Sequence, residues 1–214
     1  GTLTGPLMTR PPFRSPHHTA SYVAIVGGGA NPRPGEATLA HKGVLFLDEF
    51  PEFERRVIDS LRQPLEDRVI TVSRAKGTAQ FPANFILVAA MNPCPCGNFG
   101  FRGKECICSP VELLRYQRKI SGPILERIDI WLEVPRIDHE KLSSENNSEN
   151  SETVRSRIFG ARILQRKRFT QNPKIQTNAE MSVRDLVTTV ELHEEAKAIL
   201  NSTAEHLQIS PRVY

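Results

Sequence analysis

The chain has 214 residues, of which 39% are hydrophobic and 24% are charged, and its formal net charge is +4 at pH 7. These values are ordinary for a globular protein, and no apolar run approaches the ~18 residues that would span a bilayer. The length allows one full domain and a smaller second one. The slightly basic charge is compatible with a polyanionic partner, but it also describes many enzymes that bind no nucleic acid.

The first 43 residues are rich in proline and glycine around a single strand-like stretch at residues 21–26, so we expect a hairpin or an exposed insertion. The run from Val44 to Leu47 is then continuously apolar and ends in Asp48 and Glu49. This pattern predicts a central parallel strand that is covered on both faces. Apolar residues at helical spacing predict a helix over residues 54–62.

Further elements follow in the next part of the chain. Two strand-like runs, at 69–72 and 78–81, flank a short turn with basic residues and glycine, which predicts a β-hairpin. Residues 85–90 predict a second buried strand. Residues 109–121 predict a helix with a capping box, and alternating apolar residues predict a third strand at 128–134.

A polar, low-complexity stretch at 142–151 predicts a flexible linker, because it has too little apolar surface to fold. Residues 1–141 would then form an α/β domain with a parallel sheet and inserted hairpins. Beyond the linker, apolar stripes at helical spacing predict a small all-α domain over 152–214. The three stripes lie at 154–164, 183–190 and 192–203.

Asp48 and Glu49 are the first candidates for chemistry. A buried strand that ends in adjacent carboxylates places them at the carboxyl edge of the sheet, where open α/β folds bind their ligands. In nucleotide hydrolysis the first acid holds Mg²⁺, and the second polarises the attacking water. The alternative interpretation is an ordinary strand that ends in two solvated acids.

Asn92 and Arg127 each allow a functional and a structural interpretation. The Asn92 amide is a candidate to orient a water or contact a γ-phosphate, whereas an Asn-Pro turn needs only local backbone preferences. Arg127 is a candidate phosphate contact for a neighbouring subunit, or a surface partner of Glu126 or Asp129. The order of the elements favours the functional interpretation. A strand that ends in the acids is followed by a helix, a hairpin, a strand that leads to Asn92, a second helix and then Arg127.

With its elements in this order, the chain resembles the AAA+ ATPases, and more narrowly the magnesium-chelatase-like family of the ComM (YifB) type. The resemblance covers essentially the whole chain. It rests on the motifs Arg14-Ser15-Pro16-His17-His18-Thr19, Gly43-Val44-Leu45-Phe46-Leu47-Asp48-Glu49-Phe50, Asn92-Pro93-Cys94-Pro95-Cys96-Gly97 and Ser121-Gly122-Pro123-Ile124-Leu125-Glu126-Arg127-Ile128-Asp129.

The resemblance implies a role for each candidate residue. Asp48 and Glu49 would be the Walker B acids, with Mg²⁺ bound by Asp48, and Asn92 the sensor-1 residue. Arg127 would be an arginine finger that acts in trans within a hexameric ring, and Arg212 would be a sensor-2 residue that contacts ATP at the start of a lid helix. The second domain would be the AAA+ lid.

One expected motif is missing from the 214 residues. No Gly-x-x-x-x-Gly-Lys-Ser/Thr occurs, so the phosphate-binding backbone cradle, Lys and hydroxyl are not in this sequence. The resemblance puts the phosphate loop just upstream of Gly1, and the first residues contain no initiator Met. We therefore expect a fragment of a longer protein, which by itself is inactive and binds ATP weakly or not at all.

All four cysteines lie between positions 94 and 108, as the pairs Cys94 with Cys96 and Cys106 with Cys108. Four thiolates in two close pairs suit tetrahedral Zn²⁺, although the Cys-x-Cys spacing is tighter than in most zinc sites. Free thiols and disulfides are the alternatives. Cysteines clustered in this way favour a reducing compartment, so we expect a cytoplasmic protein, and the resemblance implies a bacterial one.

Basic residues near the predicted hairpins are candidates for contacts with DNA phosphates. Arg74 and Lys76 lie at one hairpin tip, and Arg10 and Arg14 near the other, while a solvated basic turn is the alternative. The pair His17-His18 predicts side chains on opposite faces of a strand, with a surface or packing role.

Three functions follow from these features. The resemblance implies a ring ATPase that remodels DNA as a branch-migration helicase in natural transformation, or a chelatase subunit that inserts Mg²⁺ into a porphyrin. The Cys-rich loop after Asn92 favours the first. A non-catalytic, zinc-stabilised binding module is the third possibility, and the intact Asp48, Glu49 and Arg127 speak against it.

Overall fold

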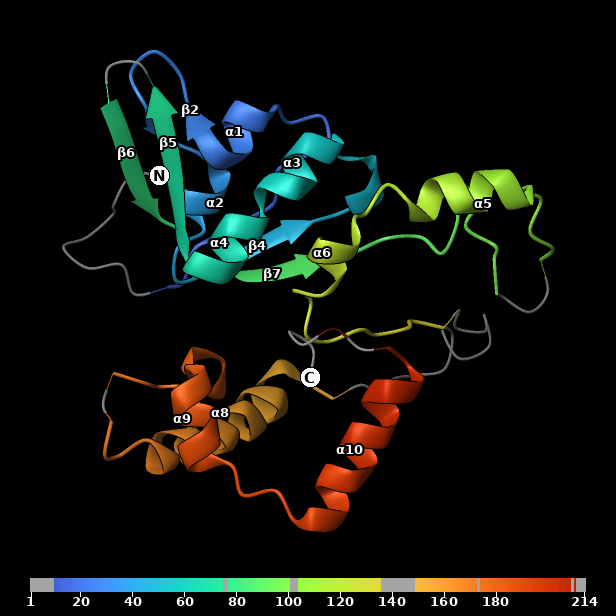
Figure 1. Cartoon of the computed structure of the whole chain (residues 1–214). Coiled ribbons are helices and arrows are strands. Elements are labelled where there is room, and N and C mark those ends of the chain that lie inside the picture. The colour runs from blue at the N-terminus through green and yellow to red at the C-terminus, as the bar shows by residue number, and fades with distance from the viewer. Residues whose placement is uncertain are drawn as a thin grey trace. The chain divides into compact units, whose positions relative to one another are not determined.

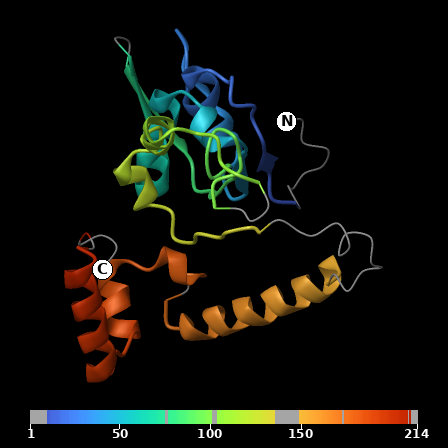
Figure 2. The same cartoon turned by 90° about the vertical axis from the view of Figure 1, so that its right-hand side faces the viewer.

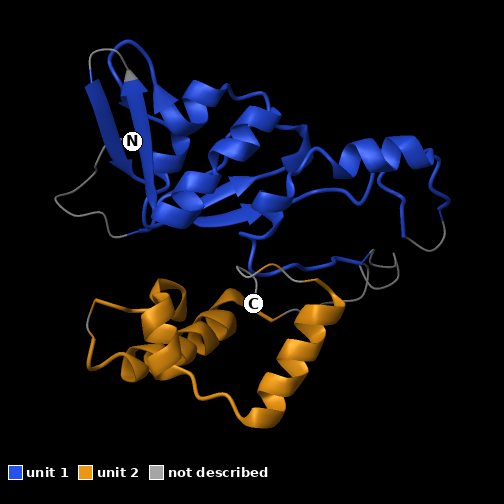
Figure 3. Cartoon of the chain, viewed as in Figure 1, with its two compact units in different colours: residues 1–136 blue, residues 137–214 orange. Residues whose placement is uncertain are grey.

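The structure, a computed structural model, describes residues 10–74, 77–100, 104–135, 149–172, 174–208 and 210, without the side chain of Arg74. The chain divides into two compact units, residues 1–136 and residues 137–214 (Figure 3). Unit 1 contains the strands together with short helices, and the described part of unit 2 is helical (Figure 1).

A three-stranded parallel sheet lies within unit 1 (Figure 1). β4 (Val44–Leu47) lies between β1 (Phe13–Arg14) and β7 (Ile86–Ala89) and pairs with both in parallel. The register puts Leu47 opposite Ala89, so that β4 and β7 end side by side. The predicted α/β fold with a parallel sheet is confirmed.

Unit 1 contains several short helices, most of which contribute residues to its apolar core. They are α1 (Tyr22–Val26), α2 (Glu36–Leu39), η1 (Phe50–Glu52), α3 (Arg55–Ser60), α4 (Arg62–Asp67), α5 (Pro110–Gln117) and α6 (Gly122–Leu125). The alternate residues Leu45 and Leu47 of β4 are fully buried, as are Leu61 between α3 and α4 and Ile124 of α6. The predicted helix over 54–62 is confirmed as α3, with α4 directly after it.

Two antiparallel hairpins complete unit 1. β2 (Gly27–Gly28) pairs with β3 (Arg33–Pro34), and β5 (Val69–Arg74) pairs with β6 (Gly77–Pro82). The second hairpin is the one predicted, and its strands are longer than expected. Ile70 and Val72 of β5 are buried in the core, because alternate residues of a strand point to the same face.

The strand expected at residues 21–26 is wrong, because this stretch forms helix α1. The side chain of Ser21 accepts a hydrogen bond from the backbone N–H of Ala24 and caps the helix. Ile25 and Val26 are buried, whereas Val23 is exposed. An N-cap and a core contact on one side have overridden the strand preference of these β-branched residues.

The burial expected for β7 and the strand expected at 128–134 are also wrong. Among the described residues only β4 pairs with β7, and Ile86 is 62% exposed. Residues 128–134 form no strand, and Ile130 and Leu132 are exposed. A strand needs a neighbour that satisfies its backbone N–H and C=O groups, which an alternating pattern alone does not provide.

The predicted capping box of α5 is confirmed. The Ser109 side chain accepts the N–H of Glu112, and the Glu112 carboxylate accepts the N–H of Ser109. The helix ends at Gln117, earlier than expected, because Ser121 lies at the N-cap of the next short helix, α6.

The described part of unit 2 contains α8 (Ser151–Arg168), η2 (Asn178–Glu180), α9 (Val183–Thr189) and α10 (Glu194–His206). Each predicted apolar stripe coincides with one of the three α-helices, and Figure 2 shows α8 as the long helix of this unit. Much of the predicted linker, up to residue 148, lies outside the described residues, and Asn150 caps α8. In the described part of the chain, no helix has the length and apolar character that a membrane span requires.

Candidate functional site

Asp48 and Glu49 follow β4 and lie exposed at the carboxyl edge of the sheet. Asp48 Oδ1 accepts the N–H of Glu49 at 2.8 Å. Glu49 has a left-handed backbone, with φ of 52°, a conformation that is uncommon for residues other than glycine and that clusters at functional sites. The next residue, Phe50, is buried, and its N–H donates to the carbonyl of Ala90 at 2.9 Å. This bond fixes the backbone directly after Glu49.

His18 is the polar side chain that contacts Glu49. Its Nδ1 lies 2.7 Å from Glu49 Oε2, and its ring meets Phe53 edge-on at 6.4 Å between centroids. The expectation that His17 and His18 point to opposite faces of a strand is wrong. Both follow β1 in a non-strand segment, and their rings lie 4.1 Å apart between centroids. The sequence places His18 four residues beyond β1, but only the parallel pairing with β4 brings it to Glu49.

Asn92 lies beyond the end of β7, on the same edge of the sheet as Asp48. The strand carries it there, because the N–H of Ala90 donates to the carbonyl of Leu47 at 3.0 Å. The backbone carbonyl of Asn92 accepts the hydroxyl of Tyr116, on α5, at 3.0 Å. Burial raises the pKa of Tyr116, and nearby acids add to the effect, so this hydroxyl keeps its proton as a donor.

Arg127 lies directly after α6 and is held within unit 1. Its guanidinium forms an ion pair with Glu66 of α4 and donates to the carbonyl of Pro123, and its side chain is only 14% exposed. The structural partner is therefore Glu66 and neither Glu126 nor Asp129. In the described part of the chain, no hydrogen bond or ion pair joins Arg127 to Asp48, Glu49 or Asn92.

The segment that carries Arg127 is anchored to α3 and α4. Ser121 donates to Asp59 at 2.7 Å, and Arg62 donates both to Asp59 at 2.7 Å and to Ser121 at 3.0 Å. This three-residue network fixes the start of α6. It leaves Arg127 at a defined, largely covered position in unit 1.

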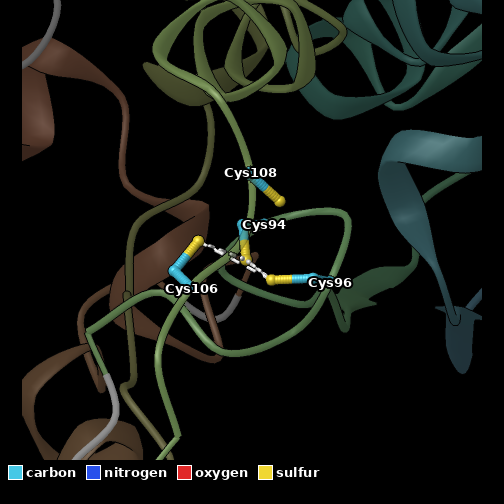
Figure 4. A group of neighbouring side chains, drawn as sticks. All are labelled: Cys94, Cys96, Cys106 and Cys108. Atoms are coloured by element: carbon cyan, nitrogen blue, oxygen red, sulfur yellow. Dashed lines mark hydrogen bonds between the residues drawn. The ribbon is translucent and has the colours of Figure 1, made fainter.

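The four cysteines form two pairs that are separated in the sequence, and the fold brings the two pairs together in one cluster. Their sulfur atoms all lie within 4.8 Å of one another (Figure 4). Cys94 is buried, and Cys96, Cys106 and Cys108 are half-buried. None of them forms a disulfide.

The pKa values of Cys96 and Cys108 are shifted in opposite directions. A backbone hydrogen bond with Asn98 lowers the pKa of Cys96 to about 6. A backbone hydrogen bond with Cys96 lowers the pKa of Cys108, but desolvation and its bonds with the other thiols outweigh this and raise it to about 12. The first thiolate thus makes formation of the next one harder, because like charges in one small volume repel.

Two family models match nearly the whole chain. The model described as magnesium chelatase, subunit ChlI, matches residues 2–142, and the model of the ChlI C-terminal region matches residues 148–214. The chain belongs to the magnesium chelatase ChlI family. This family is of the AAA+ ATPase type, as the sequence motifs predicted.

Curated relatives of this chelatase-family chain are bacterial. It is 46% identical to the uncharacterized protein YifB of Escherichia coli and 43% identical to the competence protein ComM of Haemophilus influenzae. It is 44% identical to the YifB protein of Salmonella typhimurium. Each match covers 95% of this chain and 39% of the relative. The chain therefore spans about two fifths of the length of these relatives.

Several predicted contact residues of this chelatase-family chain lie outside the described residues. Lys76 and Arg212 are among them, and of Arg74 only the backbone is described, at the end of β5. Arg14 was expected near a hairpin but lies in β1, where Glu36 accepts two hydrogen bonds from its guanidinium. The hydrogen bond with Glu36 raises the Arg14 pKa, so this arginine has a structural partner.

The sequence did not reveal a basic hollow that is lined by residues of η1 and α5. It has a volume of about 570 Å³ and lies between the η1–α3 segment and α5. Arg55, Arg115, Arg118 and Lys119 line it, and the only acid in the lining, Glu52, pairs with Lys119. The basic residues at 115–119 were visible in the sequence, but not their approach to η1.

Proposed function

We propose that the full-length protein is an ATP-driven AAA+ motor that assembles into a hexameric ring and remodels DNA in the bacterial cytoplasm. The observation that carries the proposal is the acid pair at the end of β4, beside the strand that leads to Asn92. The proposed cofactors of the full-length protein are ATP and Mg²⁺, and Zn²⁺ is its proposed structural metal.

The donor set at Asp48 fits a magnesium ion. Asp48 Oδ1 accepts the N–H of Glu49, while in the described structure Oδ2 has no protein partner and the side chain is exposed. Mg²⁺ in nucleotide enzymes is typically held by one or two carboxylates together with phosphate oxygens and waters. When bound, the ion would neutralise phosphate charge, and Asp48 is the residue that would hold it.

The remaining residues have distinct proposed roles. Glu49 would accept a hydrogen bond from the attacking water and polarise it, with its carboxylate oriented by His18. Asn92 would orient the same water or a phosphate oxygen. Arg127 would contact the nucleotide of a neighbouring subunit, for which it must exchange its bond with Glu66. Arg212 is the proposed sensor-2 contact.

DNA is the proposed substrate because a relative of this chain is named a competence protein. Arg74 and Lys76, at the tip of the β5–β6 hairpin in the sequence, are the proposed phosphate contacts. Phosphate contacts of this kind bind without reading bases. A branch-migration helicase is the finer form of this proposal.

The first test is the ATPase activity of the full-length protein, with and without branched DNA. We expect Glu49→Gln to lower kcat by about 100-fold or more, because a neutral amide polarises water poorly. Glu54→Gln is the matched control, since Glu54 is an exposed acid at the N-cap of α3 and should leave turnover unchanged. Turnover that survives Glu49→Gln would contradict the role of this residue.

The second test separates the two interpretations of Arg127. If it acts in trans, Arg127→Ala should lower kcat by about 1,000-fold with ATP affinity retained, whereas Glu66→Gln should have little effect. If the ion pair with Glu66 is what matters, both variants should lose activity and stability to a similar extent. The second pattern would remove Arg127 from the proposed catalytic set.

The third test concerns His18, which is proposed as a positioning residue. Replacing it with Ala should lower kcat of the full-length protein by about tenfold with KM for ATP unchanged, because Glu49 loses the side-chain partner that orients its carboxylate. His18→Asn, which can still donate a hydrogen bond, should recover part of the loss. Equal activity of the Ala variant and the wild type would show that the contact is dispensable.

A chelatase subunit is the second candidate function, and the description of the matching family model favours it. Metal insertion into a porphyrin, followed by absorbance, and ATPase stimulation by a four-way DNA junction distinguish the two. We expect stimulation by DNA and no insertion. A full-length protein with neither ATP turnover nor ATP binding would instead support a non-catalytic binding module.

The 214 residues themselves contain no phosphate-loop pattern. We therefore expect this chain alone to bind ATP weakly or not at all in isothermal titration. Micromolar affinity would show that ATP is held by residues other than the expected ones.

A further inference from the structure

We propose that Cys94, Cys96, Cys106 and Cys108 bind one Zn²⁺ as a four-thiolate structural site, and that this site fixes the position of Asn92. Figure 4 shows the four side chains converging from two separate stretches of the loop between β7 and α5. Cys94 and Cys96 come from its start, and Cys106 and Cys108 from its end.

The spacing of the sulfur atoms matches a metal better than it matches disulfides. The Sγ of Cys94 lies 3.4 Å from that of Cys96 and 3.8 Å from that of Cys106, and the last two are 3.6 Å apart. A Zn–S distance of about 2.3 Å in a tetrahedron places sulfurs about 3.8 Å apart. A disulfide requires about 2.05 Å.

The loop backbone supplies the contacts that a thiolate ligand needs. The N–H of Phe99 donates to the Cys94 sulfur at 3.3 Å, and the N–H of Gly97 donates to the Cys94 carbonyl at 3.0 Å. Gly97 has φ of 75°, which glycine adopts without strain and which turns the chain back over the sulfur. Such second contacts orient ligands and stabilise their negative charge.

An all-sulfur tetrahedral set selects zinc or iron among the common metals. Among the described residues, no His, Asp or Glu belongs to the group. All four positions of the tetrahedron are therefore taken by protein, which leaves no open place for a substrate or water. Closed sites of this kind stabilise structure and do not catalyse reactions.

The site lies where it can hold the candidate sensor residue. Cys94 is two residues beyond Asn92, and Cys108 immediately precedes Ser109, the N-cap of α5. From the other end of α5, the Tyr116 hydroxyl bonds to the Asn92 carbonyl. A metal would join the end of β7 to the start of α5, so Asn92 would be held on both sides. The catalytic importance of Asn92 rests on the proposed function, whereas the metal site does not.

Metal analysis of the purified 214-residue chain tests the site directly. We expect about one equivalent of zinc per chain from cells grown with zinc and purified without chelator. Cys106→Ser with Cys108→Ser should lower this below about a tenth of an equivalent. Ile107→Ala is the matched control, because Ile107 lies between these cysteines, is 84% exposed and offers no ligand, so zinc should be retained.

Other outcomes of the analysis would overturn the proposal. Less than about a tenth of an equivalent in the wild type, iron in place of zinc, or two disulfides found by mass spectrometry would each do so. If the double Cys variant does not fold, substitution of wild-type protein with Co²⁺ keeps the test open. We expect the visible absorption of tetrahedral thiolate-bound cobalt, and its absence would count against the site.

Hydrogen exchange tests the link to Asn92 without any measurement of ATP turnover. Removing zinc with a chelator should speed amide exchange in residues 90–100 and in the first turn of α5, at least tenfold. Amide exchange in the β5–β6 hairpin should not change, because its two strands are paired with each other. Unchanged exchange near Asn92 after zinc loss would show that the metal does not position this residue, whatever the outcome of the ATPase experiments.

Discussion

Unit 1 and unit 2 have equally well-formed helix ends but very different interiors. A capping box starts α5 in unit 1, and another starts α9 in unit 2, at Ser182. Yet unit 1 buries a continuous apolar core, while in the described part of unit 2 only Phe169 and Ile175 are buried hydrophobics. The difference teaches that local signals are enough to make a helix, whereas a core requires strands and helices distant in sequence to meet.

Of the substitutions that test this difference between the units, Leu45→Ala in β4 should have the largest effect on stability. Leu45 is fully buried in the central strand, so its loss should destabilise unit 1 by about 2–5 kcal/mol. Leu164→Ala on α8 is the control, because Leu164 is 66% exposed and should change stability by less than about 0.5 kcal/mol. Hydrogen exchange read separately in each unit measures both. Similar losses at both sites would show that α8 is buried in solution.

Phe169→Ala tests whether unit 2 has any core of its own. Phe169 follows α8 and is one of the two buried hydrophobics described there, so we expect about 3 kcal/mol of lost protection in α8 and no change in β4. Exchange measured by mass spectrometry checks this. An unaffected α8 would mean that its stability is purely local.

Gly43→Ala is expected to loosen the pairing of β1 with β4. A Cβ at this position would meet the carbonyl oxygen of Pro12, whose hydrogen bond with the N–H of Val44 starts the pairing. Crowding of this kind costs about 1–3 kcal/mol. The thermal midpoint of the chain should fall, and an unchanged midpoint would indicate that the backbone moves aside freely.

Gly160→Ala should give the smallest effect, with the opposite sign. Gly160 lies inside α8, and a Cβ there would meet nothing within 4 Å, so alanine should stabilise the helix by about 0.5–1 kcal/mol. Circular dichroism at increasing temperature measures this. Destabilisation would reveal a neighbour that packs against this glycine, and would weaken the contrast between the units.

The sequence predicted much of this protein where the signal was local. The apolar run into Asp48, the capping box at Ser109 and the pairing of β5 with β6 were each recognised within about ten to fifteen residues of chain, and each is present. Local signals failed at residues 21–26, where Ser21 caps a helix, and at residues 128–134, which pair with none of the described strands.

By itself, the sequence determined the α/β class, the helices α8, α9 and α10, the family and the residues that are candidates for chemistry. Only the tertiary structure decided that His18 contacts Glu49, that Arg127 pairs with Glu66, and that the four cysteines meet. The physical reason is that these contacts join segments whose approach depends on the pairing of β1, β4 and β7 and on the return of the loop before α5. Chain spacing does not encode such distances, whereas it does encode helical period and caps.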